Sequence, residues 1–323
     1  MLRGPIWLRL LRWGVLAAAG LFLYAHFNAG QGTALVAVLR ELRGDRAAVA
    51  VLLLTTLLVP VNWGMESAKW RRLMRPVQPL GRWRAFVATL AGTGIALITP
   101  NRTGEFVGRV LFLEPGVRVA GSIATALGSI AQFVVTLVAG ALALVLLGLR
   151  GAPFPWASGA ATMALLALTL LVAAGALVFY FRPALLRQLL LLVPLLRRLR
   201  PATRVLGRFR RKELLMVLAW STARYAVFTG QFVLLCGALH SGLAPGTAAL
   251  AVAVVYLIGT LVPTMFISEL GVRGSVAIAV MVPLGGGAAA VVAASGILWL
   301  LNVVLPAAVG TVLLLTARIR TKA

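Results

Sequence analysis

Charged residues interrupt an otherwise apolar sequence at two places, and at each place a carboxylate precedes a guanidinium by four residues. These charges are Arg102, Glu105 and Arg109 in TPNRTGEFVGRV, and Glu269 and Arg273 in SELGVRG. A guanidinium presents a planar set of donors that matches the oxygens of a phosphate, and a carboxylate four residues away on a helix can pair with it. The two patterns therefore indicate either an anion-binding site or ion pairs that only hold the structure, and both readings stay open.

The sequence around these charges is typical of membrane proteins. Of the 323 residues, 61% are hydrophobic and 12% are charged, and the mean hydropathy is +0.99. A soluble domain cannot hide that much apolar surface, and several apolar runs reach the roughly 20 residues that a helix needs to cross a bilayer. We therefore predict an all-α polytopic membrane protein.

The basic residues predict how the chain is threaded through the membrane. The net charge of +24 lies in short segments between the apolar runs, so it indicates topology and attraction to anionic lipid rather than nucleic-acid binding. Segment 181–212 alone holds ten Arg or Lys residues and no acid. Because basic segments stay in the cytoplasm, we expect segments 66–84 and 182–212 and both chain termini on the cytoplasmic side of the cell (inner) membrane.

The apolar runs and the charges together predict six full spans plus two re-entrant helical hairpins. The spans are expected at about 13–29, 47–65, 119–148, 158–181, 213–236 and 286–316, the first of them uncleaved. Segments 86–113 and 247–280 contain the charged patterns. The positive-inside rule requires each of them to enter and leave on one side, the first from the cytoplasm and the second from outside.

An internal repeat relates the two charged patterns. The shared residues are Pro100, Glu105 and Arg109 in the first copy, and Pro263, Glu269 and Arg273 in the second. The same shift brings the other spans of the first half onto spans of the second half. We therefore divide one transmembrane domain, residues 1–323, into a first repeat at 1–150 and a second, inverted repeat at 151–323. Inverted repeats with broken helices near the midplane are typical of secondary transporters.

Three runs of sequence resemble the flippase-like family, which is the transmembrane region of lysylphosphatidylglycerol synthases and their stand-alone membrane relatives. The runs are PNRTGEFVGR at 100–109, NWGMESAKW at 62–70 and ELGVRG at 269–274. The resemblance covers nearly the whole chain, and it implies a membrane protein that moves lipids between leaflets. By this resemblance, Pro100, Arg102, Gly104, Glu105 and Arg109 match the first family motif, and Glu269, Gly271 and Arg273 match the second.

The sequence departs from the family pattern in two respects. Family members often carry an acidic–Arg pair in the span after the first hairpin, whereas this region reads ALGSIAQFVVTL, with Gln132 and no charge. The sequence stops at Ala323, shortly after the last predicted span. We therefore expect no soluble aminoacyl-transferase domain and no synthesis of lysyl lipid by this chain.

Six ionisable residues form the predicted central site. The predicted substrate-binding residues are Arg102, Glu105, Arg109, Arg224, Glu269 and Arg273. Thr103 and Ser268 are expected to cap the returning half-helices, whose tips should meet near the centre of the bilayer. Gln132 and Asn302 lie in the middle of spans, where we expect hydrogen bonds between helices rather than ligand binding.

Two further groups of charged residues allow more than one interpretation. Arg224 lies inside the span at 213–236, where it either pairs with Glu213, extends to the membrane surface, or faces a cavity and holds a phosphate. Glu66 and Lys69 are three residues apart, so they form either a local ion pair or part of the site.

The leading functional hypothesis is a flippase-like protein that moves an anionic or polyprenyl-phosphate-linked lipid between leaflets through this Arg and Glu site. The alternative is a membrane enzyme or an accessory subunit that acts on lipid-linked sugars. The two His residues and seven acids form no metal-ligating cluster and no nucleophile–base set, so we predict no enzyme activity, no metal and no cofactor. The expected partners are the membrane and its lipid, and the oligomeric state stays open.

Overall fold

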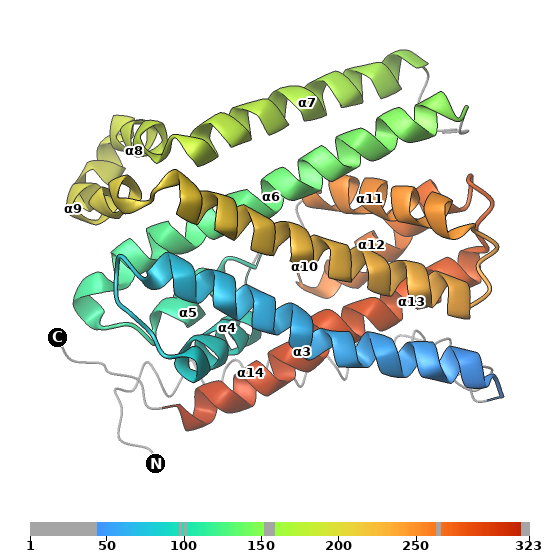
Figure 1. Ribbon diagram of the computed structural model, residues 1–323, viewed down its shortest axis with the longest axis horizontal. Helices are drawn as coiled ribbons and strands as arrows, with labels where there is room; N and C mark the ends of the chain where they lie inside the picture. Colours follow the sequence, from blue (N-terminus) through green and yellow to red (C-terminus); the bar gives the residue numbers. More distant parts are fainter. Residues whose placement is uncertain (1–43, 97–98, 100–101, 152–158, 263–265, 318–323) are drawn as a thin grey trace.

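The computed structural model describes residues 44–96, 99, 102–151, 159–262 and 266–317, and every regular element in these ranges is a helix (Figure 1). The α-helices are α3 (Arg46–Met74), α4 (Arg82–Ala96), α5 (Gly104–Val110), α6 (Arg118–Leu149), α7 (Gly159–Phe181), α8 (Pro183–Leu192), α9 (Arg200–Thr203), α10 (Arg211–Ala238), α11 (Pro245–Leu261), α12 (Phe266–Met281), α13 (Ala288–Trp299) and α14 (Leu305–Thr316). The shorter turns are the 3-10 helices η3 (Pro115–Val117), η4 (Pro194–Leu199) and η5 (Arg204–Arg208), and the π-helical turn η6 (Leu300–Val304).

Four stretches of helix are long and apolar enough to cross a membrane, judged by length and composition. They are Arg46–Met74, Pro115–Leu149, Gly159–Phe181 and Ala288–Thr316. These stretches contain or closely match four of the six predicted spans. The predicted first span, at 13–29, lies outside the described residues.

The remaining predicted span, at 213–236, forms a helix of sufficient length but of more polar composition. Helix α10 has 28 residues, which corresponds to about 42 Å at 1.5 Å per residue. Arg224 and Gln231 lie in its middle, and the side chains of Ser221 and Gln231 are buried. Because α10 packs against α3, α6 and α11, these polar groups can face protein rather than lipid.

The two predicted hairpins each form a pair of short helices. Helices α4 and α5 have 15 and 7 residues, and α11 and α12 have 17 and 16. Each is shorter than the roughly 20 residues that cross a bilayer core. In Figure 1 the α4–α5 pair lies toward the same end of the bundle as α8 and α9, and the α11–α12 pair lies toward the opposite end.

Helices from the two halves of the chain pack on one another. Helix α3 runs beside α10, α4 packs on α14, and α11 packs on α6. Each of these contacts joins a helix of the first half to a helix of the second half, so the two halves form one bundle rather than two domains (Figure 1).

Two large apolar clusters form most of the interior, and apolar side chains also cover the outside. Leu137 and Leu257 belong to the cluster between α6, α11 and α13, while Trp70 and Leu73 belong to the cluster between α3, α4 and α6. On α7 the apolar side chains point outward, and Leu171 is 72% exposed. Such an outer surface fits contact with lipid, because a protein in water rarely exposes large apolar patches.

Helices α4 and α14 approach so closely that only glycine fits at their contact. A Cβ atom added to Gly310 would overlap the carbonyl oxygen of Leu90. A Cβ atom added to Gly94 would lie 2.8 Å from Thr311 Oγ1 and 3.2 Å from the carbonyl oxygen of Ala307. Small residues of this kind allow helix backbones to touch inside membranes.

Substitution of Gly310 tests this contact. Gly310→Ala is expected to destabilise the protein by roughly 1–3 kcal/mol, because the added methyl group pushes α14 away from α4. The matched control is Gly296→Ala in α13, where an added Cβ meets no atom within 4 Å and should stabilise the helix by roughly 0.5–1 kcal/mol. Thermal unfolding in detergent compares the two, and equal melting temperatures would contradict the close contact.

Candidate functional site

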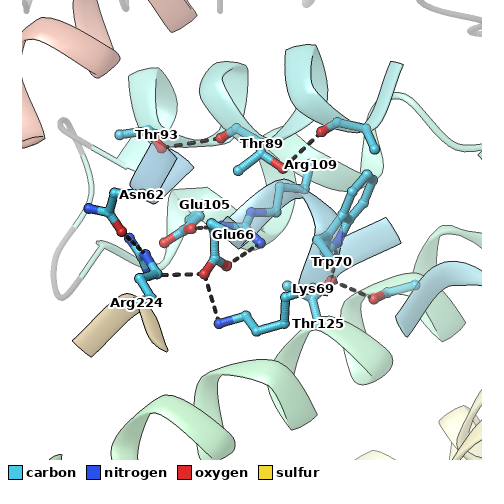
Figure 2. A network of polar contacts seen from close by, with 12 residues as sticks. Asn62, Glu66, Lys69, Trp70, Thr89, Thr93, Glu105, Arg109, Thr125 and Arg224 are labelled. Carbon is cyan, nitrogen blue, oxygen red and sulfur yellow. Dashed lines mark hydrogen bonds and ion pairs between the residues drawn. The ribbon is translucent and has the colours of Figure 1, made fainter. Parts of the chain in front are cut away.

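A buried carboxylate, that of Glu66 on α3, contacts three cations from three helices (Figure 2). Its Oε2 lies 2.7 Å from Lys69 Nζ and 2.9 Å from Arg224 Nη1, and its Oε1 lies 2.9 Å from Arg109 Nη1. Nη2 of Arg109 also donates to Glu105 on the same helix, α5. The side chains of Glu66, Lys69 and Arg109 are no more than 6% exposed. Because buried charges are costly unless they are paired, this network ties α3, α5 and α10 together.

Arg224 extends the network through its other donor atoms and its flat face. Its Nε donates to Asn62 Oδ1 at 2.9 Å. The centre of its guanidinium lies 5.2 Å from the ring centroid of Trp63 and 5.1 Å from that of Phe228. Cation–π contacts of this kind stabilise a desolvated guanidinium, so α3 and α10 both hold Arg224 in one orientation.

A ladder of amide side chains continues from Asn62 toward the last helix. Asn62 Nδ2 donates to Asn302 Oδ1 at 3.0 Å, and Asn302 Nδ2 donates to Gln231 Oε1 at 3.1 Å. Gln231 Nε2 donates to the carbonyl oxygen of Thr55 at 2.8 Å. Asn302 lies in the π-helical turn η6, a feature that is common at functional sites. The predicted role of Asn302 in hydrogen bonds between helices is confirmed.

A cavity of about 240 Å³ lies beside this network, and three arginine residues line it. Arg102 lies just before α5, Arg224 lies on α10 and Arg273 lies on α12. The rest of the wall is mainly aromatic and aliphatic. Those residues are Gln132, Thr136, Tyr225, Phe228, Phe232, Val255, Tyr256, Gly259, Thr260, Val272, Val276, Ser295, Leu298, Trp299, Asn302 and Val303.

The structure separates the predicted site residues into two groups. Arg102, Arg224 and Arg273 line the cavity. Glu105 and Arg109 instead form an ion pair in the buried network and are not among the lining residues. The backbone of Glu269 lies in α12, and its side chain is outside the described part of the chain.

The backbone of Arg102 adopts a conformation that favours glycine. Its φ angle is +58°, in the left-handed region, where a residue other than glycine is disfavoured by roughly 1–2 kcal/mol. Backbone strain of this kind is concentrated at functional sites. An arginine in this conformation, with its side chain at the cavity wall, is therefore consistent with a functional role for the guanidinium.

One sequence-based expectation needs correction. Thr103 does not cap α5: it makes no side-chain cap hydrogen bond, and the backbone N–H of Gly104 instead donates to Thr99 Oγ1 at 2.7 Å. Of the alternatives for Arg224, the cavity position is the one observed. Its ion pair is with Glu66 and not with Glu213, which accepts a hydrogen bond from the backbone N–H of Arg210 at the start of α10. The predicted cap at Ser268 concerns a side chain outside the described part.

The central role of Glu66 was not predicted. The Glu66–Lys69 pair expected from spacing does form, but spacing gave no sign of the contacts with Arg109 and Arg224. The sequence did contain one indication of this role, which is the presence of Lys69 three residues after Glu66 in an apolar helix. A lysine in an apolar helix is almost never fully buried unless it is paired, and a buried carboxylate beside it can hold further cations.

These features define a class of protein: a polytopic helical membrane protein whose interior holds paired ions beside an arginine-lined cavity. The sequence matches the family described as Lysylphosphatidylglycerol synthase TM region over residues 11–310. The chain therefore belongs to this family, as the resemblance of its motifs indicated. No curated protein and no solved structure matches the chain.

Neutralising Glu66 tests the network as the support of the bundle. Glu66→Gln is expected to destabilise the protein by about 3–5 kcal/mol, because it removes one side of several buried ion pairs. The control is Glu213→Gln, which alters a cap at the start of α10 and should cost about 1 kcal/mol or less. The measurement is thermal unfolding of both variants in the same detergent. A Glu66→Gln protein as stable as the control would refute a supporting role for Glu66.

Proposed function

We propose that this protein is a flippase-like protein that moves an anionic lipid, or a lipid-linked phosphate, between the leaflets of the cell membrane through the Arg-lined cavity. The observation that carries the proposal is that Arg102, Arg224 and Arg273 come from three separate elements and meet at one cavity. An ionisable residue inside a membrane is costly and is a functional-site hypothesis by default, and guanidinium groups suit phosphate oxygens. Membership of a lipid-related membrane family supports the same function.

The proposal includes an inverted repeat, with 1–150 as the first copy and 151–323 as the second. It is supported by the way in which equivalent helices of the two copies pack on each other's partners. If α3, α4 and α6 correspond to α10, α11 and α13–α14, then the contact of α4 with α14 mirrors the contact of α11 with α6. The same correspondence exchanges α3 with α10, so the contact between these two helices maps onto itself. A two-fold axis in the membrane plane produces this exchange, and it makes α4–α5 and α11–α12 re-entrant hairpins from opposite sides.

Arg224 links lipid binding to the contact between the two halves. It lines the cavity and also pairs with Glu66 across the α3–α10 contact. A lipid phosphate in the cavity competes with Glu66 for this guanidinium and weakens the pair that joins α3 to α10. A ligand shifts a conformational equilibrium only through such differential contacts, so Arg224 is the residue through which an occupied site favours rearrangement of the bundle.

Transport by purified protein tests the proposed function. In vesicles that contain the protein, a fluorescent anionic phospholipid or a polyprenyl phosphate should change leaflet faster than in empty vesicles, and it should be recovered chemically unchanged. The double variant Arg224→Gln, Arg273→Gln should slow this exchange by about tenfold or more, because the charge-assisted bonds to phosphate are lost. The double variant Arg75→Gln, Arg82→Gln, at two exposed arginines, removes the same charge and serves as the control.

Two outcomes would count against the proposed function. Exchange no faster than in empty vesicles for every lipid class would remove its support. Recovery of a chemically altered lipid would favour the alternative of a membrane enzyme that acts on lipid-linked substrates.

The proposed threading can be tested by labelling single cysteines in a Cys236→Ala background. Gly207 lies in η5, which follows α9, Gly116 lies in η3, which precedes α6, and Gly246 lies at the start of α11. In Figure 1 α9 and the start of α6 lie at one end of the bundle, and the start of α11 lies at the other. Because basic segments stay in the cytoplasm, an impermeant maleimide added to intact cells should label only Gly246→Cys. Lysis should expose the other two. Labelling of all three in intact cells would contradict the proposed topology.

A further inference from the structure

We propose that the cavity selects a lipid phosphomonoester, whose headgroup is a terminal phosphate with two negative charges, over lipids whose phosphodiester carries one. This inference deepens the proposed function and rests on it for the presence of a lipid in the cavity. It follows from the number of charges, from the donor atoms that face the cavity and from the size of the cavity.

The charges around the cavity do not balance. The cations of this region are Lys69, Arg102, Arg109 and Arg224, and the carboxylates are Glu66 and Glu105. Among the side chains that the structure describes, four cations against two carboxylates leave two positive charges. The other described carboxylates lie elsewhere: Asp45 caps α3, Glu213 caps α10 and Glu114 precedes η3.

Two uncompensated charges are costly at this depth. The side chains of Lys69 and Arg109 are 4% and 3% exposed, and that of Arg224 is 14% exposed. Water therefore screens them poorly, and an anion that neutralises the region gains more here than at the surface. A phosphomonoester carries about −1.5 to −2 at pH 7, whereas a phosphodiester carries about −1. The monoester therefore restores neutrality and the diester does not.

The donors that face the cavity suit a terminal phosphate. A phosphomonoester offers three acceptor oxygens, and three residues that carry guanidinium donors, Arg102, Arg224 and Arg273, line the cavity. Arg224 uses Nε for Asn62 and Nη1 for Glu66. A guanidinium has five N–H donors, so Arg224 has donors beyond these two bonds with which a phosphate can bond as it competes with Glu66 for the positive charge.

The size and the walls of the cavity suit a small headgroup. Its volume of about 240 Å³ is below the roughly 300 Å³ at which pockets for drug-sized ligands begin. Phe228, Tyr256, Val276 and Leu298 supply apolar wall. A bare phosphate with the first methylene groups of a lipid chain matches these walls.

Binding of short-chain lipids to the purified protein in detergent tests this selection. Dioctanoyl phosphatidic acid and a short polyprenyl phosphate are the two sources of the same headgroup chemistry, and dioctanoyl phosphatidylglycerol is the singly charged control. At least one monoester should bind about tenfold more tightly than phosphatidylglycerol near pH 7.5, and the preference should shrink near pH 5, because the second phosphate pKa is about 6. The monoester that binds more tightly identifies the source.

Variants of Arg102 test whether the preference for a phosphomonoester arises at the cavity. Arg102→Gly removes one cation and relieves the left-handed backbone, so loss of folding does not explain its effect; it should lose most of the preference for the monoester. Arg102→Lys keeps the charge and should retain the preference, as should the surface control Arg82→Gln. Equal affinity for monoesters and phosphatidylglycerol, or a preference untouched by Arg102→Gly, overturns the inference.

The same proteins in the vesicle assay separate this inference from the proposed function. Exchange of phosphatidylglycerol without any preference for monoesters would leave the proposed function in place and refute the selection. A preference in binding without exchange of any lipid would retain the selection and refute transport.

Discussion

The need to pair charges inside an apolar bundle determines the arrangement of this protein. Glu66 is the carboxylate that meets this need for Lys69, Arg109 and Arg224. Because lipid and apolar side chains offer no alternative partners, the helices that carry these cations must lie where their side chains reach one acceptor. This requirement, together with apolar packing, holds α3, α5 and α10 in their positions.

The amide ladder and the cavity extend from the same contact. Asn62 binds Arg224 on one side and Asn302 on the other, so the last helix is held at its π-helical turn to the α3–α10 contact. Arg224 belongs both to the ion network and to the cavity wall. A change at the cavity therefore reaches buried contacts among several helices directly, without a long chain of intermediate residues.

Sequence reasoning was most successful for features that depend on neighbouring residues. Long apolar runs identified four membrane-crossing helices, and the spacing of Glu105 and Arg109 identified their ion pair. It was least successful for contacts between distant parts of the chain. Glu66 meets Arg109 and Arg224, which are 43 and 158 residues away, and helical periodicity carries no information about such partners. The cap at Thr103 failed because Thr99, five residues before Gly104, supplied the acceptor instead.

The glycine contact between α4 and α14 has a mechanical consequence. The two backbones touch without side chains between them, so no layer of flexible atoms allows one helix to slide past the other. Helix α14 belongs to the second half of the chain and α4 to the first, so this contact joins the two halves backbone to backbone. A motion that parts the halves at the midpoint of the sequence would have to separate these two helices.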